Sequence, residues 1–472
     1  MKAFIFFSVH EQLFHSIAEQ LKPFGVSQFS GFVWGQQQEA AIQNRGITYD
    51  PLVVFSRDLL PKADDGAKPD FEWLAQRERE LGISIQRMVI AERHLLAGRS
   101  FDRIMRMAEV ALREVAAAYD RARPDFILSE DISCFHSWVH FAIARERGIP
   151  FWAISSGRLP RRINVYADGP FGWQRFETVY AEIRRRGLTS DERGAAETYL
   201  QNFLDRPVRP TGMNTRAAKP TVGKNEVTRF RGATLRFLGD RKDPTAVPPL
   251  RQIKGRLLRM GRVAVADARR IFEKPVAGEK YVLYPIHFQP EASTLVQGPL
   301  YVDQLALLQD LGASLPVGYR LYVKEHLSNR GRRPLAFYDA IRAMPWARLL
   351  GPDEDTWQLI RNAGAVAVIT GTMGQEALML GTPVVTFGSV FFNQHPSVAQ
   401  LARAPKDDWH RLLARAIAQK PDREATIAMI AALQASSYPG FMANPNTFAE
   451  VLDPENVRLL TAALVDTLGL TR

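Results

Sequence analysis

The sequence contains only one cysteine, Cys134, among its 472 residues. A single cysteine cannot form a disulfide within the chain or a thiolate zinc cluster, and such scarcity is typical of proteins in a reducing compartment. Runs of about 18 apolar residues are also missing, so we expect no transmembrane helix. Residues 1–16 have too short an apolar core for a signal peptide and soon include His and Glu. We therefore expect a protein of the cytoplasm that is either soluble or attached to one side of a membrane.

Acidic residues are scarce between Arg206 and Arg270. This segment has 17 Lys or Arg residues and four Asp or Glu residues, a net charge of +13, while the whole chain carries +11. The basic character of the protein therefore belongs to this one segment. Six prolines between residues 206 and 250 predict a loosely packed connector there.

The residues from Leu250 to Phe272 have the pattern of an amphipathic helix. Its apolar stripe consists of Leu250, Ile253, Leu257 and Met260, and its cations are Arg251, Lys254, Arg256, Arg259, Arg262, Arg269 and Arg270. Such a helix can lie in an anionic membrane interface. Alternatively, the stripe packs on the protein while the cations are solvated, or the cations bind an anionic glycan. Nucleic acid is not expected as a partner, because the basic segment has no aromatic residues besides Phe230 and Phe237.

Apolar runs of strand length alternate with amphipathic helix patterns in both halves of the chain. Strands are predicted at 3–7, 29–34, 125–129, 151–154, 281–285, 319–323, 347–350, 365–369 and 384–387. Helices are predicted at 10–21, 101–119, 135–147, 301–311, 335–343, 356–362 and 454–468. This alternation indicates an α/β fold with parallel sheets covered by helices. We predict an N-terminal domain at 1–205, a basic connector with its amphipathic helix at 206–275, a C-terminal domain at 276–437 and a return helix within 438–472.

Residues 364–388 form the most informative stretch of the sequence. A buried strand is predicted at 365–369, a Gly-rich turn at 370–374, a short helix at 375–380 and a second strand at 384–387. The turn would place backbone N–H groups and the positive end of a helix dipole at the carboxyl edge of a parallel sheet, where they can bind an anion. Gly371 and Gly374 would allow the backbone to approach a phosphate closely. The alternative is that these glycines only close the turn.

Polar side chains follow three predicted strands of the second half. Gln289 and Glu291 follow the first, and Lys324 and His326 follow the second. After the fourth come Thr370, Gly371, Thr372, Gly374 and Glu376. Ligands of open α/β sheets bind beyond the carboxyl ends of the strands, so these residues are expected to converge on a nucleotide-type ligand. Each cluster alone could equally be a solvated loop.

The first half has its own candidates near the carboxyl ends of strands. Glu130 and Asp131 follow a strand and could act as a base or a nucleophile, although an Asp at this position could simply cap the next helix. His10 follows the first strand, where a structural role is the alternative. Arg158 and Arg161 follow another strand and could bind an anionic acceptor or be solvated. His136 and His140 lack a third ligand, so we expect no metal site.

The motifs of the second half resemble the bacterial capsular-polysaccharide biosynthesis family, which includes the β-Kdo transferases. The resemblance rests on Gln289-Pro290-Glu291, on Val323-Lys324-Glu325-His326 and on the run from Thr370 to Gly388. It covers about a quarter of the chain. A weaker similarity extends over residues 125–170, around Glu130-Asp131 and Ser155-Ser156-Gly157-Arg158.

The resemblance implies a GT-B-like architecture, in which two Rossmann-like domains face each other across a cleft and the C-terminal helix packs back on the N-terminal domain. It implies a metal-independent glycosyltransferase without a cofactor, which transfers a sugar such as Kdo from a nucleotide-sugar donor to a glycan or glycolipid acceptor. The donor would bind mainly to the C-terminal domain, and the reaction would take place at the inner face of the inner membrane. The alternatives are a sugar-nucleotide epimerase of the same fold and a non-catalytic polysaccharide-binding or export protein.

Overall fold

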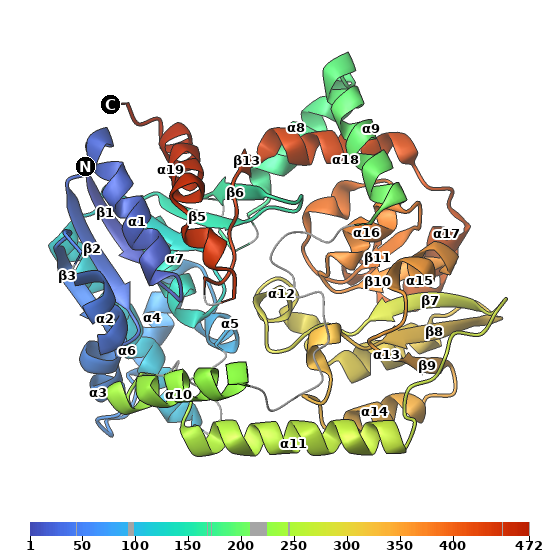
Figure 1. Cartoon of the computed structure of the whole chain (residues 1–472), viewed down its shortest axis with the longest axis horizontal. Coiled ribbons are helices and arrows are strands. Elements are labelled where there is room, and N and C mark those ends of the chain that lie inside the picture. Colours follow the sequence, from blue (N-terminus) through green and yellow to red (C-terminus); the bar gives the residue numbers. More distant parts are fainter. Residues whose placement is uncertain are drawn as a thin grey trace.

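The computed structural model describes residues 1–43, 45–92, 99–167, 169–170, 172–207, 224–243, 246–445 and 447–471 (Figure 1). These residues form two α/β domains, each built on one sheet, that lie side by side. A pair of helices runs along one edge of both domains, and the end of the chain returns to the first domain. No helix in the described part of the chain is long and apolar enough to cross a membrane.

The N-terminal sheet has seven strands in the order β13-β6-β5-β4-β1-β2-β3. The strands are β1 Lys2–Phe6, β2 Gln28–Val33, β3 Tyr49–Val54, β4 Phe126–Glu130, β5 Phe151–Ser156, β6 Arg162–Tyr166 and β13 Tyr438–Pro439. The strands from β3 to β5 are parallel, whereas β6 and β13 are antiparallel at one edge. The four strands predicted in this half are therefore present, and β3, β6 and β13 were not predicted.

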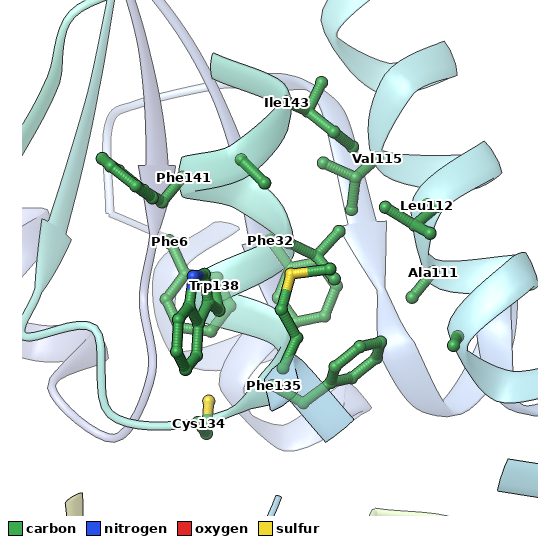
Figure 2. Packing of buried hydrophobic residues seen from close by; sticks show 14 of the residues in the cluster. Phe6, Phe32, Ala111, Leu112, Val115, Cys134, Phe135, Trp138, Phe141 and Ile143 are labelled. Carbon is green, nitrogen blue, oxygen red and sulfur yellow. The ribbon is translucent and has the colours of Figure 1, made fainter. Parts of the chain in front are cut away.

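Helices cover both faces of the N-terminal sheet. They are α1 Glu11–Leu21, α2 Gln36–Gln43, α3 Leu60–Ala63, α4 Phe71–Leu81, α5 Ile85–Ile90, α6 Phe101–Ala122 and α7 Phe135–Glu146. Figure 2 shows one side of this core, where Phe6 and Phe32 of the sheet pack against Phe135 and Trp138 of α7. Helix α7 is buried on nearly all sides, including His136 and His140. His140 Nδ1 lies 2.8 Å from the Tyr119 hydroxyl, so this histidine has a structural role.

The C-terminal sheet has six strands in the order β12-β11-β10-β7-β8-β9, with parallel pairing throughout. The strands are β7 Lys280–Pro285, β8 Tyr319–Lys324, β9 Ala347–Leu350, β10 Ala365–Val368, β11 Val384–Thr386 and β12 Val398–Gln400. The helices are α12 Ala292–Leu295, α13 Gln304–Ala313, α14 Leu335–Arg342, α15 Thr356–Asn362, α16 Met373–Met379 and α17 Trp409–Ala418. Strand β10 is completely buried, as expected for a central parallel strand covered on both faces.

The end of the chain crosses back to the N-terminal domain. After α18 (Arg423–Ser436), strand β13 pairs with β6, and α19 (Pro454–Leu468) packs against α1. Its buried residues Val457, Leu460 and Leu464 join the hydrophobic cluster beneath the N-terminal sheet. The predicted fold is thereby confirmed: the protein has two Rossmann-like α/β domains in a GT-B-like arrangement, with the C-terminal helix on the N-terminal domain.

Two helices before the connector pack away from the N-terminal sheet. Helices α8 (Gln174–Arg186) and α9 (Ser190–Asp205) lie against α18. Their buried residues share a hydrophobic cluster with β7 and β10. The predicted domain limits stay a prediction, but these contacts place α8 and α9 with the C-terminal core.

The basic connector contains two helices, α10 (Lys224–Gly239) and α11 (Pro249–Ala268), which contact each other. Asp240, just after α10, is buried and accepts hydrogen bonds from Gln36 N at 2.9 Å and Ser56 Oγ at 2.7 Å. The buried carboxylate of Asp240 therefore fixes the end of α10 to the N-terminal domain, while α10 itself keeps exposed apolar side chains such as Leu235 and Leu238. Residues 208–223, 244 and 245 lie outside the described residues.

Candidate functional site at the domain junction

The carboxyl ends of strands from both sheets meet at one place. Glu130 ends β4, Asp131 follows it, and Arg158 lies in the loop after β5. On the other domain, Gln375 of α16 donates a hydrogen bond from Nε2 to the carbonyl oxygen of Arg158 at 3.0 Å. This bond joins the Gly-rich turn of the C-terminal domain to the N-terminal strand ends. The sequence-predicted clusters of the two halves are therefore neighbours.

His10 is held between a carboxylate and a carbonyl. Its Nδ1 lies 2.7 Å from Glu130 Oε2, and its Nε2 lies 3.2 Å from the carbonyl oxygen of Ala443. Burial by itself lowers the pKa of His10, but the charge of Glu130 and the bonds to Glu130 and Ala443 outweigh it, so the pKa lies above 6.5. Both ring nitrogens face acceptors, so the protonated ring can donate two hydrogen bonds, one to Glu130 and one to Ala443.

This geometry changes the role expected for His10. In its protonated form, the ring has no free lone pair with which to accept a proton from a substrate. It instead stabilises the ionised form of Glu130, whose side chain keeps 21% of its surface exposed. Of the residues predicted as catalytic, Glu130 keeps part of its side chain exposed, and His10 is in direct contact with it.

Asp131 is bound within the N-terminal domain. The Tyr166 hydroxyl donates a short hydrogen bond to Asp131 Oδ1. Burial raises the pKa of Asp131, while the bond from Tyr166 and the charge of Arg158 act in the opposite direction. The alternative of an Asp cap is wrong, because the cap of α7 is Cys134, which forms a capping box with Ser137. Asp131 thus links Tyr166 to Arg158.

The Arg158 guanidinium lies over the Trp173 ring, 4.8 Å from its centroid. Burial lowers the pKa of Arg158, while Asp131, Tyr166 and Glu291 raise it. Its buried Nε has no hydrogen-bond partner in the described part of the chain. Arg158 is therefore a cation at the junction that interacts electrostatically with carboxylates of both domains.

The second predicted arginine is placed elsewhere. Arg161 is 73% exposed in a turn, 3.9 Å from Glu450 and 6.0 Å from the centroid of Phe441. These contacts put its side chain beside the returning C-terminal segment. The structure thus brings Arg158, and not Arg161, to the junction.

The Gly-rich turn is fastened to the segment that follows β7. Thr370 N donates to His287 Nε2 at 3.3 Å, and Thr370 Oγ1 donates to the carbonyl oxygen of Ser293 at 2.7 Å. Burial lowers the pKa of His287 to about 3, so its ring is neutral and can accept this bond. A Cβ at Gly371 would lie 3.0 Å from His287 Nε2. Close packing against this ring is one reason for a glycine at that position.

The two residues predicted to follow β7 have different surroundings. Gln289 donates to the carbonyl oxygen of Val302 at 2.8 Å and accepts from Gln304 Nε2 at 2.8 Å. Gln289 therefore stabilises the loop that follows β7 within the C-terminal domain. Glu291 is exposed and accepts from Ser293 Oγ at 2.8 Å, and its charge reaches Arg158. Glu291 belongs to the junction.

The strand end after β8 is largely internal. Lys324 is buried, and its Nζ donates to the carbonyl oxygen of Pro352 at 2.9 Å. Glu325 is also buried and accepts from the Tyr338 hydroxyl at 2.6 Å. Burial raises the pKa of Glu325 against the opposing effects of Arg333 and Tyr338. His326 is the exposed member of this cluster, with Nδ1 3.2 Å from Ser328 N.

The remaining predicted donor residues lie at the start of α16. Thr372 is partly exposed at its N-cap. A Cβ at Gly374 would lie only 2.6 Å from Cζ of Phe392, so internal packing requires a glycine at this position. Glu376 is buried and accepts from Trp357 Nε1 at 3.1 Å.

Sequence reasoning missed three parts of the junction: Tyr166, Trp173 and the carbonyl of Ala443. Tyr166 and Trp173 come after the strand that carries the Arg158 loop, but nothing in their local pattern distinguishes them from core aromatics. Among the described residues, no group of three or more His, Cys, Asp or Glu side chains is arranged to hold a metal ion.

Residues 277–441 match the family model described as capsule polysaccharide biosynthesis protein. This match confirms the resemblance that the motifs between Gln289 and Gly388 predicted. It covers the C-terminal domain, including all predicted donor residues. No curated protein matches the chain.

The solved structures that match this chain include two β-Kdo transferases and a UDP-GlcNAc 2-epimerase, each with a TM-score below 0.5. A β-Kdo 2,4 transferase, KpsC of Thermosulfurimonas dismutans, is 14% identical, with a TM-score of 0.39 over 72% of this chain and 87% of that one. The β-Kdo 2,7 transferase of the same organism is 13% identical, with a TM-score of 0.39 over 75% and 90%. A UDP-GlcNAc 2-epimerase of Neisseria meningitidis is 12% identical, with a TM-score of 0.25 over 99% of both chains.

Proposed function

We propose that this protein is a glycosyltransferase of capsule polysaccharide biosynthesis. It would transfer a sugar from a nucleotide-sugar donor to a glycan or glycolipid acceptor. The observation that carries the proposal is the family match over residues 277–441. That region contains the Gly-rich turn, Glu291 and His326.

Glu130 is the residue we propose as the base that activates the acceptor hydroxyl. A general base must be ionised at the working pH and within reach of the hydroxyl. The imidazolium of His10, 2.7 Å away, favours the ionised carboxylate, and the side chain keeps a partly exposed surface. Asp131 is less suited to this task because it is engaged by Tyr166, and we assign it the positioning of Arg158.

The donor would lie against the C-terminal side of the junction. Gly371 and Thr372 are partly exposed there, and Glu291 and His326 are exposed. We propose that Arg158 and His326 attract the anionic groups of the donor and that Glu291 contacts its hydroxyl groups. Lys324, Gln289 and Glu376 would support this surface from within, because each is bonded to its own domain.

The motif resemblance to β-Kdo transferases makes a CMP-sugar the proposed donor class and metal independence the proposed mode. The test is a nucleotide-release assay of the full chain with CMP-Kdo, UDP-GlcNAc and GDP-mannose, with and without a capsule-type glycan or glycolipid acceptor, and with EDTA present. We expect release of free nucleotide from one donor, only when the acceptor is added.

Other outcomes of this assay identify the alternatives. Conversion of a nucleotide sugar into its epimer without an acceptor would indicate an epimerase. Binding of glycan without consumption of any donor would indicate a non-catalytic polysaccharide-binding protein. Either result would overturn the proposed transfer.

A further inference from the structure

Large exposed apolar side chains are concentrated on one short part of the chain. Among the described residues 18 such side chains occur, and 11 of them lie between residues 227 and 265. They are Val227, Phe230, Leu235, Leu238, Val247, Leu250, Ile253, Leu257, Leu258, Met260 and Val265. An exposed apolar patch of this kind, rimmed by polar residues, marks a surface that interacts with another protein, a ligand or a membrane. We call this surface, formed by α10, α11 and Val247, the α10–α11 face.

The apolar stripe of α11 points away from the protein. Leu250 is 82% exposed and Leu257 is 63% exposed, whereas Val263 and Ala266 on the other side of the helix are buried. The stripe lines an open hollow of about 600 Å³ together with Leu335 of α14. The alternative that this stripe packs on the protein is therefore wrong.

The cations of α11 divide into two groups. Arg259 and Arg262 donate to the carbonyl oxygens of Arg330 and Arg332 at 2.9 and 2.6 Å, and Arg269 pairs with Asp339 at 2.7 Å. These contacts attach the helix to the C-terminal domain. Arg251 and Lys254, in the first turns, are exposed beside Leu250 and Leu257.

The described carboxylates of the same segment are buried or paired with the protein. Asp240 is bonded to Gln36 and Ser56. Asp243 is buried, and Asp267 pairs with Arg330 at 3.3 Å. The outward side of α10 and α11 therefore combines apolar side chains with positive charge. This is the surface chemistry of helices that lie in an anionic lipid interface, with apolar groups at the acyl boundary and cations among the headgroups.

We propose that the α10–α11 face binds an anionic lipid surface. The two helices contact each other, and in Figure 1 they lie along one edge of the molecule. Both domains would then stand on the same side of the lipid layer. This inference goes beyond the proposed function, because lipid binding requires no sugar transfer.

The test is flotation of the full chain with vesicles of phosphatidylcholine alone or mixed with phosphatidylglycerol. We expect binding to the mixed vesicles and release as the salt concentration passes the screening range. Leu250→Glu with Leu257→Glu should reduce binding about tenfold or more, because charged groups replace the inserted side chains. Arg251→Glu with Lys254→Glu should reduce binding to a similar extent, on the order of tenfold.

Matched controls make the same chemical changes elsewhere. Val317→Glu alters a side chain that is 101% exposed in the C-terminal domain, and Arg185→Glu with Arg423→Glu reverses two exposed cations on α8 and α18. These variants should bind like the unaltered chain.

The proposal is overturned if the chain does not bind mixed vesicles, binds neutral vesicles equally well, or binds unchanged after both pairs of substitutions on α11. Sedimentation of the protein without vesicles tests whether a second copy of the chain covers the α10–α11 face instead. A dimer that Leu257→Glu dissociates would assign the face to a second copy and contradict the proposal. Vesicle binding without nucleotide release would support lipid binding and contradict the proposed transferase activity. Nucleotide release without vesicle binding would support the transferase activity and contradict lipid binding.

Discussion

The two sides of the domain junction are built in different ways. On the N-terminal side, contacts come from far along the chain, as with His10 and Ala443 or Arg158 and Gln375. On the C-terminal side, Lys324, Gln289 and Glu376 are bonded to groups of their own domain. The polar motifs of the C-terminal domain therefore contribute mostly to the packing of that domain. On the N-terminal side, the contacts of His10 and Arg158 are made by residues that are distant in the sequence.

The largest expected effect on stability comes from a substitution in the Gly-rich turn, which tests whether Gly374 is required for the packing of this turn. Gly374→Val should lower the free energy of unfolding by about 1–3 kcal/mol, because the new side chain overlaps the buried Phe392 ring. Denaturant unfolding followed by circular dichroism measures it. Gly194→Val on α9 is the control, since nothing lies within 4 Å of that position. Equal stability of the two variants would show that the packing of the turn does not require a glycine at position 374.

A smaller effect distinguishes the two predicted arginines. Arg158→Ala should cost about 1 kcal/mol of unfolding free energy, because a partly buried cation–π contact with Trp173 is lost. Arg161→Ala should change stability by less than about 0.5 kcal/mol, because that side chain is mostly exposed. The comparison is made by denaturant unfolding of both variants. A larger loss of unfolding free energy for Arg161→Ala than for Arg158→Ala would contradict the conclusion that Arg158, and not Arg161, lies at the domain junction.

The next prediction concerns the link between the tail and His10. Asn456 accepts from Phe441 N at 2.7 Å and donates to the carbonyl oxygens of Phe441 and Val451 at 2.9 and 2.8 Å. It thereby holds the segment that presents Ala443. Asn456→Ala should lower the pKa of His10, measured by NMR titration of the ring with His10→Gln for assignment. Asn444→Ala, in the same segment, is the comparison variant. An unchanged titration of His10 in Asn456→Ala would show that the tail does not set its charge.

The smallest effect is a pH dependence of stability. The folded protein holds the pKa of His10 above 6.5, so the protonated ring stabilises the fold fully at pH values below 6.5. This contribution is lost as the pH rises through the folded pKa. The stability difference between the unaltered chain and His10→Gln should therefore shrink from pH 6 to pH 9 in denaturant unfolding. A difference that grows with pH would mean that the ring is neutral.

The regular framework could be predicted from the sequence. Every strand expected in the C-terminal half is present, because buried parallel strands such as β10 are continuous apolar runs. Strand β6, with Arg162, Asn164 and Tyr166, is only half apolar and lies near a sheet edge. Strand β3 contains Asp50 and Pro51, which are rare in strands. Both were missed for these reasons.

The site could be predicted only in part. The structure places Glu130, Arg158, Glu291 and the Gly-rich turn at the domain junction, since parallel topology brings the carboxyl ends of strands together. Charge states and partners could not be predicted, because they depend on contacts such as that of Ala443, 433 residues after His10. The family match covers residues 277–441, the same part of the chain that carries the motifs.

The most direct test of the account compares Glu130→Gln with the unaltered chain in turnover and in donor affinity. The account predicts that turnover falls by a factor on the order of 10² or more, the usual effect of losing a general base. The donor dissociation constant should change little, since the donor is proposed to lie against the C-terminal side of the junction and Glu130 is not among its proposed contacts. Glu450→Gln, the same change at a more exposed carboxylate, should leave both quantities as they are. Normal turnover of Glu130→Gln would contradict the central claim that this carboxylate is the base at the domain junction.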